Sequence, residues 1–270
     1  MRKLVLILGL SFILSFSANA SEYIPCGESE AGSCFSCGDT CSARLTYSNE
    51  TDAINQTNAT LTFSGNGHMY NYESPNDNPE FVEPWYGVRD SIKNVVVEEG
   101  ITHLGNRTVY WMENLTDVSL PQSLTSIGMR AFFGSKRLKE INIPPSVTSI
   151  REFAFQRTKV KEIVIPENLT NFSNAFICEG NIKKCSNVAP IEKIYCTSNN
   201  ADACAEAVAH LGITPTIYEK TQNGDYYVNG KWYQNLNDIL SGNNIKKRIY
   251  TIDEANRVAG TKNRVSIKYR

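Results

Sequence analysis

Eight cysteines are the residues in this chain whose spacing points most directly to chemistry. They fall in two groups of four: Cys26, Cys34, Cys37 and Cys41, then Cys178, Cys185, Cys196 and Cys204. The stretch Cys34-Phe35-Ser36-Cys37 could bind zinc or act as a redox pair. A redox motif is expected at the start of a helix, however, and the neighbouring Gly, Ser and Asp residues favour a loop. An even, locally clustered set therefore predicts structural disulfides, with three possible connectivities in each group.

Other patterns that could do chemistry are weak. The three histidines, His68, His103 and His210, lie in different predicted modules, so we expect no multi-histidine metal centre. Four carboxylates could flank a sugar in a hydrolase, although acidic side chains at strand ends are often only solvated: Glu98, Glu99, Glu140 and Glu162. The chain has no G-x-S-x-G elbow, phosphate-binding glycine loop or HExxH pair. The sequence therefore predicts neither catalysis nor a cofactor.

The first twenty residues have the three parts of a secretory signal. Arg2 and Lys3 precede an apolar run from Leu4 to Phe16, and Ala18-Asn19-Ala20 resembles a cleavage site. The run is shorter than the roughly 20 residues of a membrane span. We therefore predict a protein secreted to the periplasm, the cell surface or the outside, without a transmembrane segment. Losing the two positive charges of this segment changes the formal net charge from −1 to −3, which disfavours nucleic acid as a partner.

Two consecutive stretches, residues 118–140 and 141–162, have nearly the same pattern. Matching positions are Val118/Ile141, Leu120/Ile143, Pro121/Pro144, Leu124/Val147, Ile127/Ile150, Ala131-Phe132/Ala154-Phe155 and Leu138/Val160. A third copy begins at Ile163 and reaches Ala175-Phe176, and a fainter copy precedes them from Val95 to Leu115. The starts at 95, 118, 141 and 163 are 23, 23 and 22 residues apart, which is in the range of leucine-rich repeats.

Each repeat begins with an apolar-x-apolar triplet, which predicts a short strand with both apolar side chains on one face. Pro121, Pro144 and Pro166 end these strands because proline cannot donate the next ladder hydrogen bond. The Thr-Ser-Ile anchors and the Ala-Phe pairs return beneath the strand, with Phe132 and Phe155 in the interior. Copies stacked about 4.8 Å apart give a parallel ladder on one side and irregular turns on the other. A β-sandwich with similar hairpins is the alternative, but it does not explain the constant spacing.

The pattern I-x-I-P-x-S-V-T-S-I-x-x-x-A-F of residues 141–155 resembles the Treponema-type, or BspA-like, leucine-rich repeats of bacterial surface and secreted proteins. Residues 59–72 and 83–102 are similar to the N-terminal cap segment of that family. The resemblance covers about residues 41–176 and implies a β-rich leucine-rich-repeat solenoid. It also implies protein or glycan binding in adhesion or host contact, without a shared catalytic site. The chain departs from the family pattern in its few copies and its distinct C-terminal end.

The ends of such a ladder need caps over their strand edges, and the two cysteine groups lie where caps are expected. Upstream, Thr60–Phe63 and His68–Asn71 flank a Ser-Gly-Asn-Gly turn and predict a hairpin. Downstream, residues 191–196 predict a last ladder strand, and Asn200–Leu211 predicts a helix that carries Cys204. The expected organisation is a signal peptide (1–20), an N-terminal cap (21–90), leucine-rich repeats (91–198), a helical C-terminal cap (199–215) and a basic α+β module (216–270).

The C-terminal module contains the dipeptide Asn229-Gly230, which predicts a type I′ hairpin between residues 226–228 and 231–233. Residues 248–252 and 264–269 predict strands, and 253–259 a short helix with a Thr251-x-x-Glu254 capping box. Residues 216–270 carry ten Lys/Arg and five Asp/Glu. These charges either keep a small domain soluble or dock it electrostatically to an anionic surface or partner.

The candidate binding face consists of the outward strand positions and their neighbours: Asp117, Ser119, Glu140, Asn142, Glu162 and Val164. The predicted function is protein or glycan binding at a cell surface. The alternatives are a structural spacer or assembly protein of the envelope and, with less support, a secreted hydrolase.

Overall fold

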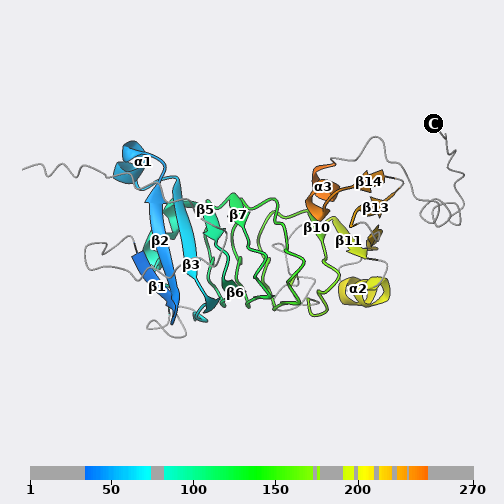
Figure 1. The fold of residues 1–270 in the computed structure, drawn as a ribbon. Coiled ribbons are helices and arrows are strands. Elements are labelled where there is room, and N and C mark those ends of the chain that lie inside the picture. The colour runs from blue at the N-terminus through cyan, green and yellow to red at the C-terminus, as the bar shows by residue number, and fades with distance from the viewer. Residues whose placement is uncertain are drawn as a thin grey trace, which may run out of the picture.

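The computed structural model describes most of the chain between Cys34 and Gly242. The described residues are 34–73, 82–172, 175–176, 191–197, 200–209, 213–220, 224–229 and 231–242. Successive turns of the chain lie side by side from the N-terminal to the C-terminal end (Figure 1). The predicted signal peptide, Cys26, Cys178, Cys185, and the strands and helix predicted within residues 248–269 lie outside the described residues.

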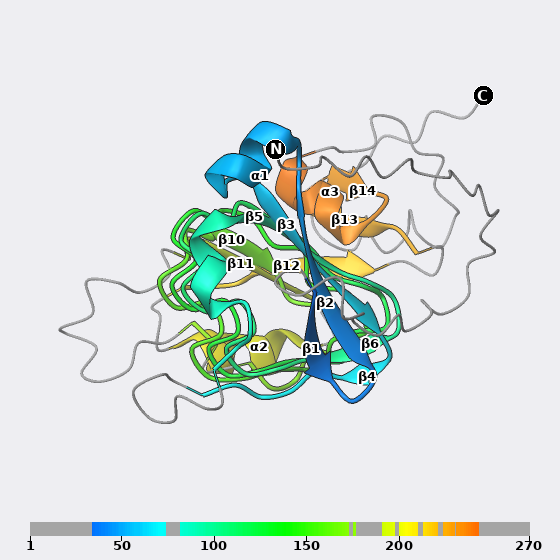
Figure 2. The same ribbon diagram turned by 90° about the vertical axis from the view of Figure 1, so that its left-hand side faces the viewer.

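The N-terminal sheet combines antiparallel cap strands with the first parallel ladder. Its order is β1 (Cys34–Gly38), β2 (Cys41–Tyr47), β3 (Ala59–Gly65), β5 (Ile92–Val97) and β7 (Asp117–Ser119). The first three strands pair antiparallel and lie across the end of the stacked turns (Figure 2). β3 with β5 and β5 with β7 pair parallel, and Val95 lies opposite Val118. The predicted parallel ladder is therefore confirmed for the first two repeats.

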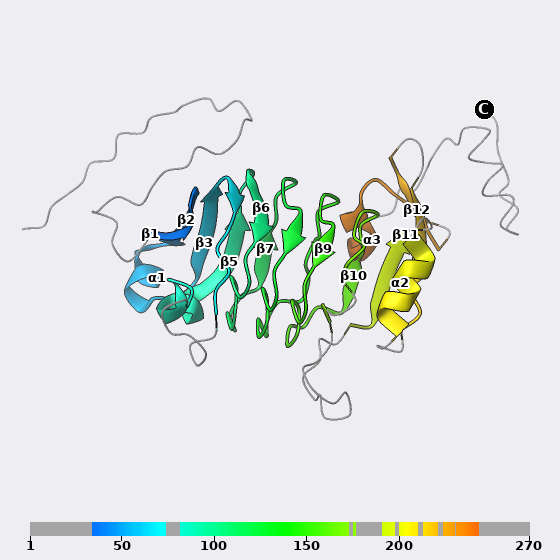
Figure 3. The ribbon, with the colours of Figure 1, turned by 90° about the horizontal axis from the view of Figure 1, so that it is seen from below.

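A second parallel sheet replaces the irregular turns that we predicted on the other side of the repeats. It contains β4 (Gly67–His68), β6 (Ile101–Leu104), β8 (Ser126–Ile127) and β9 (Ser149–Ile150), in that order (Figure 3). The backbone N–H of Thr125 donates to the carbonyl of Thr102, and that of Thr148 to Thr125, both at 2.8 Å. The Thr-Ser-Ile anchors are thus ladder strands as well as apolar anchors, which suits their β-branched side chains.

The hairpin predicted around residues 64–67 is wrong, because β3 and β4 belong to different sheets. Gly65 and Gly67 have φ angles of 123° and 83°, and they turn the chain through a corner instead of reversing it. A Cβ atom on Gly65 would lie 2.0 Å from the carbonyl oxygen of Thr40, so no other residue fits there. On each side of the corner the strand pairs with the following repeat: β3, before the corner, pairs with β5, and β4, after it, pairs with β6.

Phenylalanine rings stack through the interior of the repeats. Phe132, Phe155 and Phe176 are fully buried, and neighbouring ring centroids lie 5.5 Å apart with interplanar angles of 7° and 16°. Trp85 is also fully buried, and its indole N–H donates to the carbonyl of Thr108 at 2.9 Å. The interior placement predicted for Phe132 and Phe155 is confirmed.

The C-terminal sheet continues from the last repeat into the segment after residue 216. Its order is β10 (Glu162–Val164), β11 (Lys193–Thr197), β12 (Thr216–Lys220), β13 (Tyr226–Val228) and β14 (Lys231–Tyr233). β10, β11 and β12 pair parallel, so the predicted last ladder strand is confirmed. β13 and β14 form the predicted hairpin, with Asn229 at a φ of 47°. The boundary expected at residue 216 falls between two neighbouring strands of one sheet.

Four short helices flank these sheets in the described ranges: α1 (Glu50–Asn55), the 3-10 helix η3 (Tyr86–Ser91), α2 (Ala201–Val208) and α3 (Leu236–Ser241). The predicted helix that carries Cys204 is α2, which contacts β11. α3 begins after Asn235, whose side chain accepts the N–H of Asp238, and ends at Gly242 with a φ of 72°. None of the helices in the described ranges has the length and apolar character that crossing a membrane requires.

Disulfides join neighbouring elements at both ends of the repeats. Cys37 on β1 bonds to Cys41 on β2, and Cys196 on β11 bonds to Cys204 on α2. Cys34 is also disulfide-bonded. The sulfurs of Cys34 and Cys37 are therefore not available as thiolates for the zinc site that we considered from the sequence.

Candidate functional site

A groove lies over the outward face of the first ladder and extends to α3. It consists of three hollows of about 410, 380 and 330 Å³ that share lining residues. We call it the ladder groove; its polar lining comprises Asn94, Thr116, Asp117, Ser119, Gln122, Lys139, Glu140, Asn142, Lys159, Lys161, Glu162, Asn235 and Asn237. Four of the six predicted binding residues, Asp117, Ser119, Glu140 and Asn142, are exposed within it.

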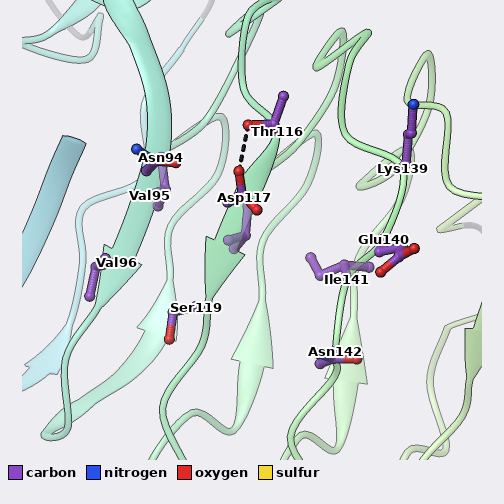
Figure 4. A pocket seen from close by; sticks show the side chains of 11 residues that line it. Asn94, Val95, Val96, Thr116, Asp117, Ser119, Lys139, Glu140, Ile141 and Asn142 are labelled. Atoms are coloured by element: carbon purple, nitrogen blue, oxygen red, sulfur yellow. Dashed lines mark hydrogen bonds between the residues drawn. The ribbon is translucent and has the colours of Figure 1, made fainter. Parts of the chain in front are cut away.

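The repeat places equivalent side chains along the floor of the groove (Figure 4). Asn94, Asp117 and Glu140 are 23 residues apart and form one polar row. A second row contains Ser119 and Asn142, also 23 residues apart. Side chains alternate between the two faces of a strand, so the positions between these rows are apolar and pack on the core. The result is a lining of hydroxyl, amide and carboxylate groups over an apolar base.

The backbone of the groove offers hydrogen-bonding groups as well. β7 pairs with β5 on one edge, but residues 139–142 form no strand. No backbone hydrogen bond within the described part of the chain joins residues 139–142 to 116–119 or to 162–164. Peptide groups that a neighbouring strand would normally pair therefore lack a strand partner at this point of the ladder.

The C-terminal end of the predicted face is covered. Val164, which we expected to point outward into solvent, is only 6% exposed. It belongs to a second apolar cluster with Tyr195, Tyr218, Val228, Tyr233 and Ile239. Because β12, β13, β14 and α3 supply most of this cluster, the segment after residue 216 buries the outward side of β10. The placement of Val164 in an open face is therefore corrected.

Glu162 is half-buried at the same end and is tied to its neighbours. Its carboxylate accepts a hydrogen bond from Lys193 Nζ at 2.7 Å and from the Tyr195 hydroxyl at 3.0 Å. The bond from Lys193, more than that from Tyr195, holds the pKa of Glu162 below its usual range. A general acid in a glycosidase needs a raised pKa, so the environment of Glu162 opposes that role. Glu99 instead accepts the backbone N–H groups of residues 122 and 123.

The wall formed by α3 was missed from the sequence. Asn235 and Asn237 line one hollow, and Leu240 lines another. A signal was present: an asparagine cap at Asn235 followed by Gly242 is a typical start and stop of a short helix. This signal does not show which side of the helix faces the groove, because that depends on the contacts between α3 and β10.

The central part of the chain matches a known family of repeats. Residues 85–201 match the model of the BspA type leucine rich repeat region, with six copies. This part of the chain is similar to BspA-type leucine-rich repeat regions. The six copies extend the three clear repeats and the fainter one found from apolar spacing.

Solved leucine-rich repeat structures are similar to the chain. The structure of a leucine-rich repeat protein from Eubacterium ventriosum is 25% identical, with a TM-score of 0.43, over 73% of this chain and 49% of its own. The T. pallidum leucine-rich repeat protein is 17% identical, with a TM-score of 0.35, over 57% and 68%. A leucine-rich cell surface protein from Faecalibacterium prausnitzii is 19% identical, with a TM-score of 0.32, over 74% and 62%. The chain thus spans about half the length of the first relative. No curated protein matches it.

Two of the histidines expected to lie apart are brought together outside the ladder groove. His68 on β4 and His103 on β6 occupy paired positions of the second ladder. Burial, followed by the nearby His68 and Arg151, lowers the pKa of His103. His210 lies outside the described residues.

Proposed function

We propose that the protein is a secreted or cell-surface protein, a short leucine-rich-repeat solenoid whose ladder groove binds a protein or glycan ligand in adhesion or host contact. The observation that carries this proposal is the row of polar side chains at 23-residue spacing beside peptide groups that lack a strand partner. Such groups recognise a hydrogen-bonding ligand without any chemical step. The signal-like residues 1–20 support export.

The size of the open face limits the affinity that a single copy can reach. Three rungs about 4.8 Å apart and about 10 Å long present roughly 150 Å², against about 800 Å² per partner in a standard interface. Useful affinity therefore requires contacts with the α3 wall or the N-terminal cap, or many copies on one surface. Tight binding by an isolated fragment of residues 91–198 would contradict this proposal.

A structural spacer or envelope assembly protein is the second candidate. It is favoured by the burial of Val164, because a chain that covers part of its own ladder face gives up binding area. The two functions differ in whether the exposed groove residues matter to a partner. A hydrolase has less support, since the one groove carboxyl with a resolved pKa shift, Glu162, is shifted downward.

The test compares the mature chain with the triple variant Asp117→Ala, Ser119→Ala and Asn142→Ala on immobilised host and bacterial surface proteins and on a glycan array. A ligand of the groove should bind the variant at least tenfold more weakly, while the melting temperature stays the same. Glu152→Ala is the matched control, because Glu152 is exposed and does not line the groove. Equal binding by all three chains would contradict ligand binding by the ladder groove and would favour the spacer function.

A further inference from the structure

The second ladder holds a cluster of metal-ligating groups where the N-terminal cap meets the repeats. β4 and β6 lie side by side (Figure 2), and His68 is the partner of His103 in their parallel pairing. The two imidazole ring centroids are 5.3 Å apart at an interplanar angle of 38°. Asn71, three residues beyond His68, places its side-chain oxygen 3.4 Å from Nε2 of His103. His68 and Asn71 are exposed, and His103 is half-buried.

Hydrogen bonds orient the amide and imidazole groups of this cluster. Asn71 Oδ1 accepts the backbone N–H of Asn106 at 2.9 Å, so its oxygen, not its nitrogen, faces His103. Nδ1 of His103 lies 2.8 Å from the hydroxyl of Ser126 on β8. Nε2 of His103 therefore points at an oxygen acceptor across a distance that is long for a hydrogen bond, whose usual N···O distance is about 2.9 Å.

These separations suit two ligands of one tetrahedral metal ion. Bonds of about 2.0–2.1 Å to nitrogen and oxygen place neighbouring tetrahedral ligand atoms about 3.4 Å apart. Two imidazoles bound in the same way have ring centroids about 5.2 Å apart, because each centroid lies roughly 3.2 Å from the metal. The measured values in the cluster are 3.4 Å and 5.3 Å.

We propose that His68, His103 and Asn71 form a surface site for a divalent transition metal ion of the zinc class, with water in the fourth position. Imidazole nitrogen is a preferred ligand of such ions, and an amide oxygen completes an open three-ligand set. In the metal-bound form His103 carries its proton on Nδ1 and donates it to Ser126 Oγ, which leaves the Nε2 lone pair for the metal. The ion joins the cap strand β4 to the first repeat strand β6.

Two features set the expected strength of the site. The described residues contain no group of three or more His, Cys, Asp or Glu that could hold a metal, and the third ligand here is a neutral amide. After burial and His68, Arg151 also lowers the pKa of His103, and its positive charge opposes a bound cation. We therefore expect binding that is weaker than at a four-ligand structural zinc site. Binding should become tighter when the neutral amide ligand is replaced by a carboxylate or when the positive charge of Arg151 is removed.

The experiment uses the full mature chain, purified without a polyhistidine tag and stripped of metal, titrated with Co²⁺ and then with Zn²⁺. The site predicts one saturable equivalent of Co²⁺ with the intense visible absorption of tetrahedral coordination, which Zn²⁺ abolishes by displacement. His68→Gln should weaken binding at least tenfold and leave the melting temperature of the metal-free chain unchanged, since His68 is exposed. His210→Gln is the matched control and should bind like the parent chain.

Two further variants should strengthen metal binding instead of weakening it. Asn71→Asp keeps the acceptor for Asn106 but supplies a charged ligand, so Zn²⁺ should bind several-fold more tightly. Arg151→Gln should also tighten binding, by a smaller factor that shrinks as salt is raised. Absence of saturable binding, or binding that survives His68→Gln or is lost with His210→Gln, would overturn the proposal.

Discussion

The same repeat position has opposite environments in the two halves of the ladder face. Ser119 and Asn142 are exposed in the ladder groove, whereas Val164, which follows Asn142 by one 22-residue repeat, is buried under the segment after residue 216. The preceding acidic positions differ in the same way. Asp117 and Glu140 are exposed, and Glu162 is held by Lys193 and Tyr195. The repeat thus defines a face, and the segment after residue 216 covers part of that face.

The largest effect should come from the core that both halves share. Phe155 stacks between Phe132 and Phe176 and is fully buried, so Phe155→Ala should lower the free energy of unfolding by about 3–5 kcal/mol. Denaturant unfolding measures this loss. Ile54→Ala is the control, because Ile54 is 81% exposed and its replacement should change stability by less than about 0.5 kcal/mol. A near-zero loss for Phe155→Ala would mean that the ring points outward.

A reciprocal exchange tests the two halves directly. Val164→Asn introduces the residue of the open half into the covered half, where an unpaired amide and the lost apolar contact should cost about 2–4 kcal/mol. Asn142→Val makes the opposite change at an exposed position and should alter the free energy of unfolding by less than about 0.5 kcal/mol. Equal effects of the two substitutions, measured by denaturant unfolding, would show that β10 is not covered in solution.

A comparison of two carboxyl groups predicts the pH dependence of stability. Glu83, at the N-terminal end, is 2% exposed, and both of its carboxyl oxygens are buried without a partner from another side chain. Burial, opposed in part by a hydrogen bond from its own backbone and by Arg89 and Arg107, raises its pKa from 4.5 to about 7. Below pH 4.5 the group is protonated in the folded and unfolded chains. As the pH rises toward 7, ionisation favours the unfolded chain, which should cost about 3 kcal/mol of stability by pH 8.

The measurement is the free energy of unfolding between pH 4 and pH 8, for the parent chain and for Glu83→Gln. The variant should lose most of the decline with pH, because its amide does not ionise. Glu162→Gln is a control of opposite sign. Since the folded-state pKa of Glu162 is lowered, its contribution is present above its unfolded pKa and disappears as the pH falls. An unchanged decline in Glu83→Gln would contradict the assignment to Glu83.

The repeats could be predicted because their signals are local and recur. Apolar triplets, prolines and Ala-Phe pairs at 22- or 23-residue spacing placed Phe132 and Phe155 in the interior and Asp117, Ser119, Glu140 and Asn142 along one face. The second ladder gave a weaker signal, because β8 and β9 contain only two residues each and alternation cannot be read from two.

Other features depend on contacts that no local pattern encodes. Arg107, Arg130 and Phe153 recur at 23-residue spacing with φ angles of 55°, 55° and 60°, yet none is a glycine that would mark a left-handed turn. The pairing of His68 with His103 follows from the register of β4, a two-residue strand. The burial of Val164 follows from the packing of a later segment with no repeat of its own.

The smallest effect on the folded chain should come from removing the end of the C-terminal segment. Residues 216–242, which cover β10, contain two Lys/Arg and three Asp/Glu, whereas residues 243–270, outside the described ranges, contain eight and two. We predict that electrostatic docking to an anionic surface depends on the latter residues alone. A chain that ends at Gly242 keeps β12, β13, β14 and α3, so its melting temperature should match that of the full chain.

The full chain should sediment with anionic vesicles at 0.15 M salt and be released at 1 M, because the screening length of electrostatic attraction falls from about 8 Å to about 3 Å. The shortened chain should remain in solution at both. Equal sedimentation of both chains at every salt concentration would exclude docking through residues 243–270 and would leave their charges the role of keeping the chain soluble.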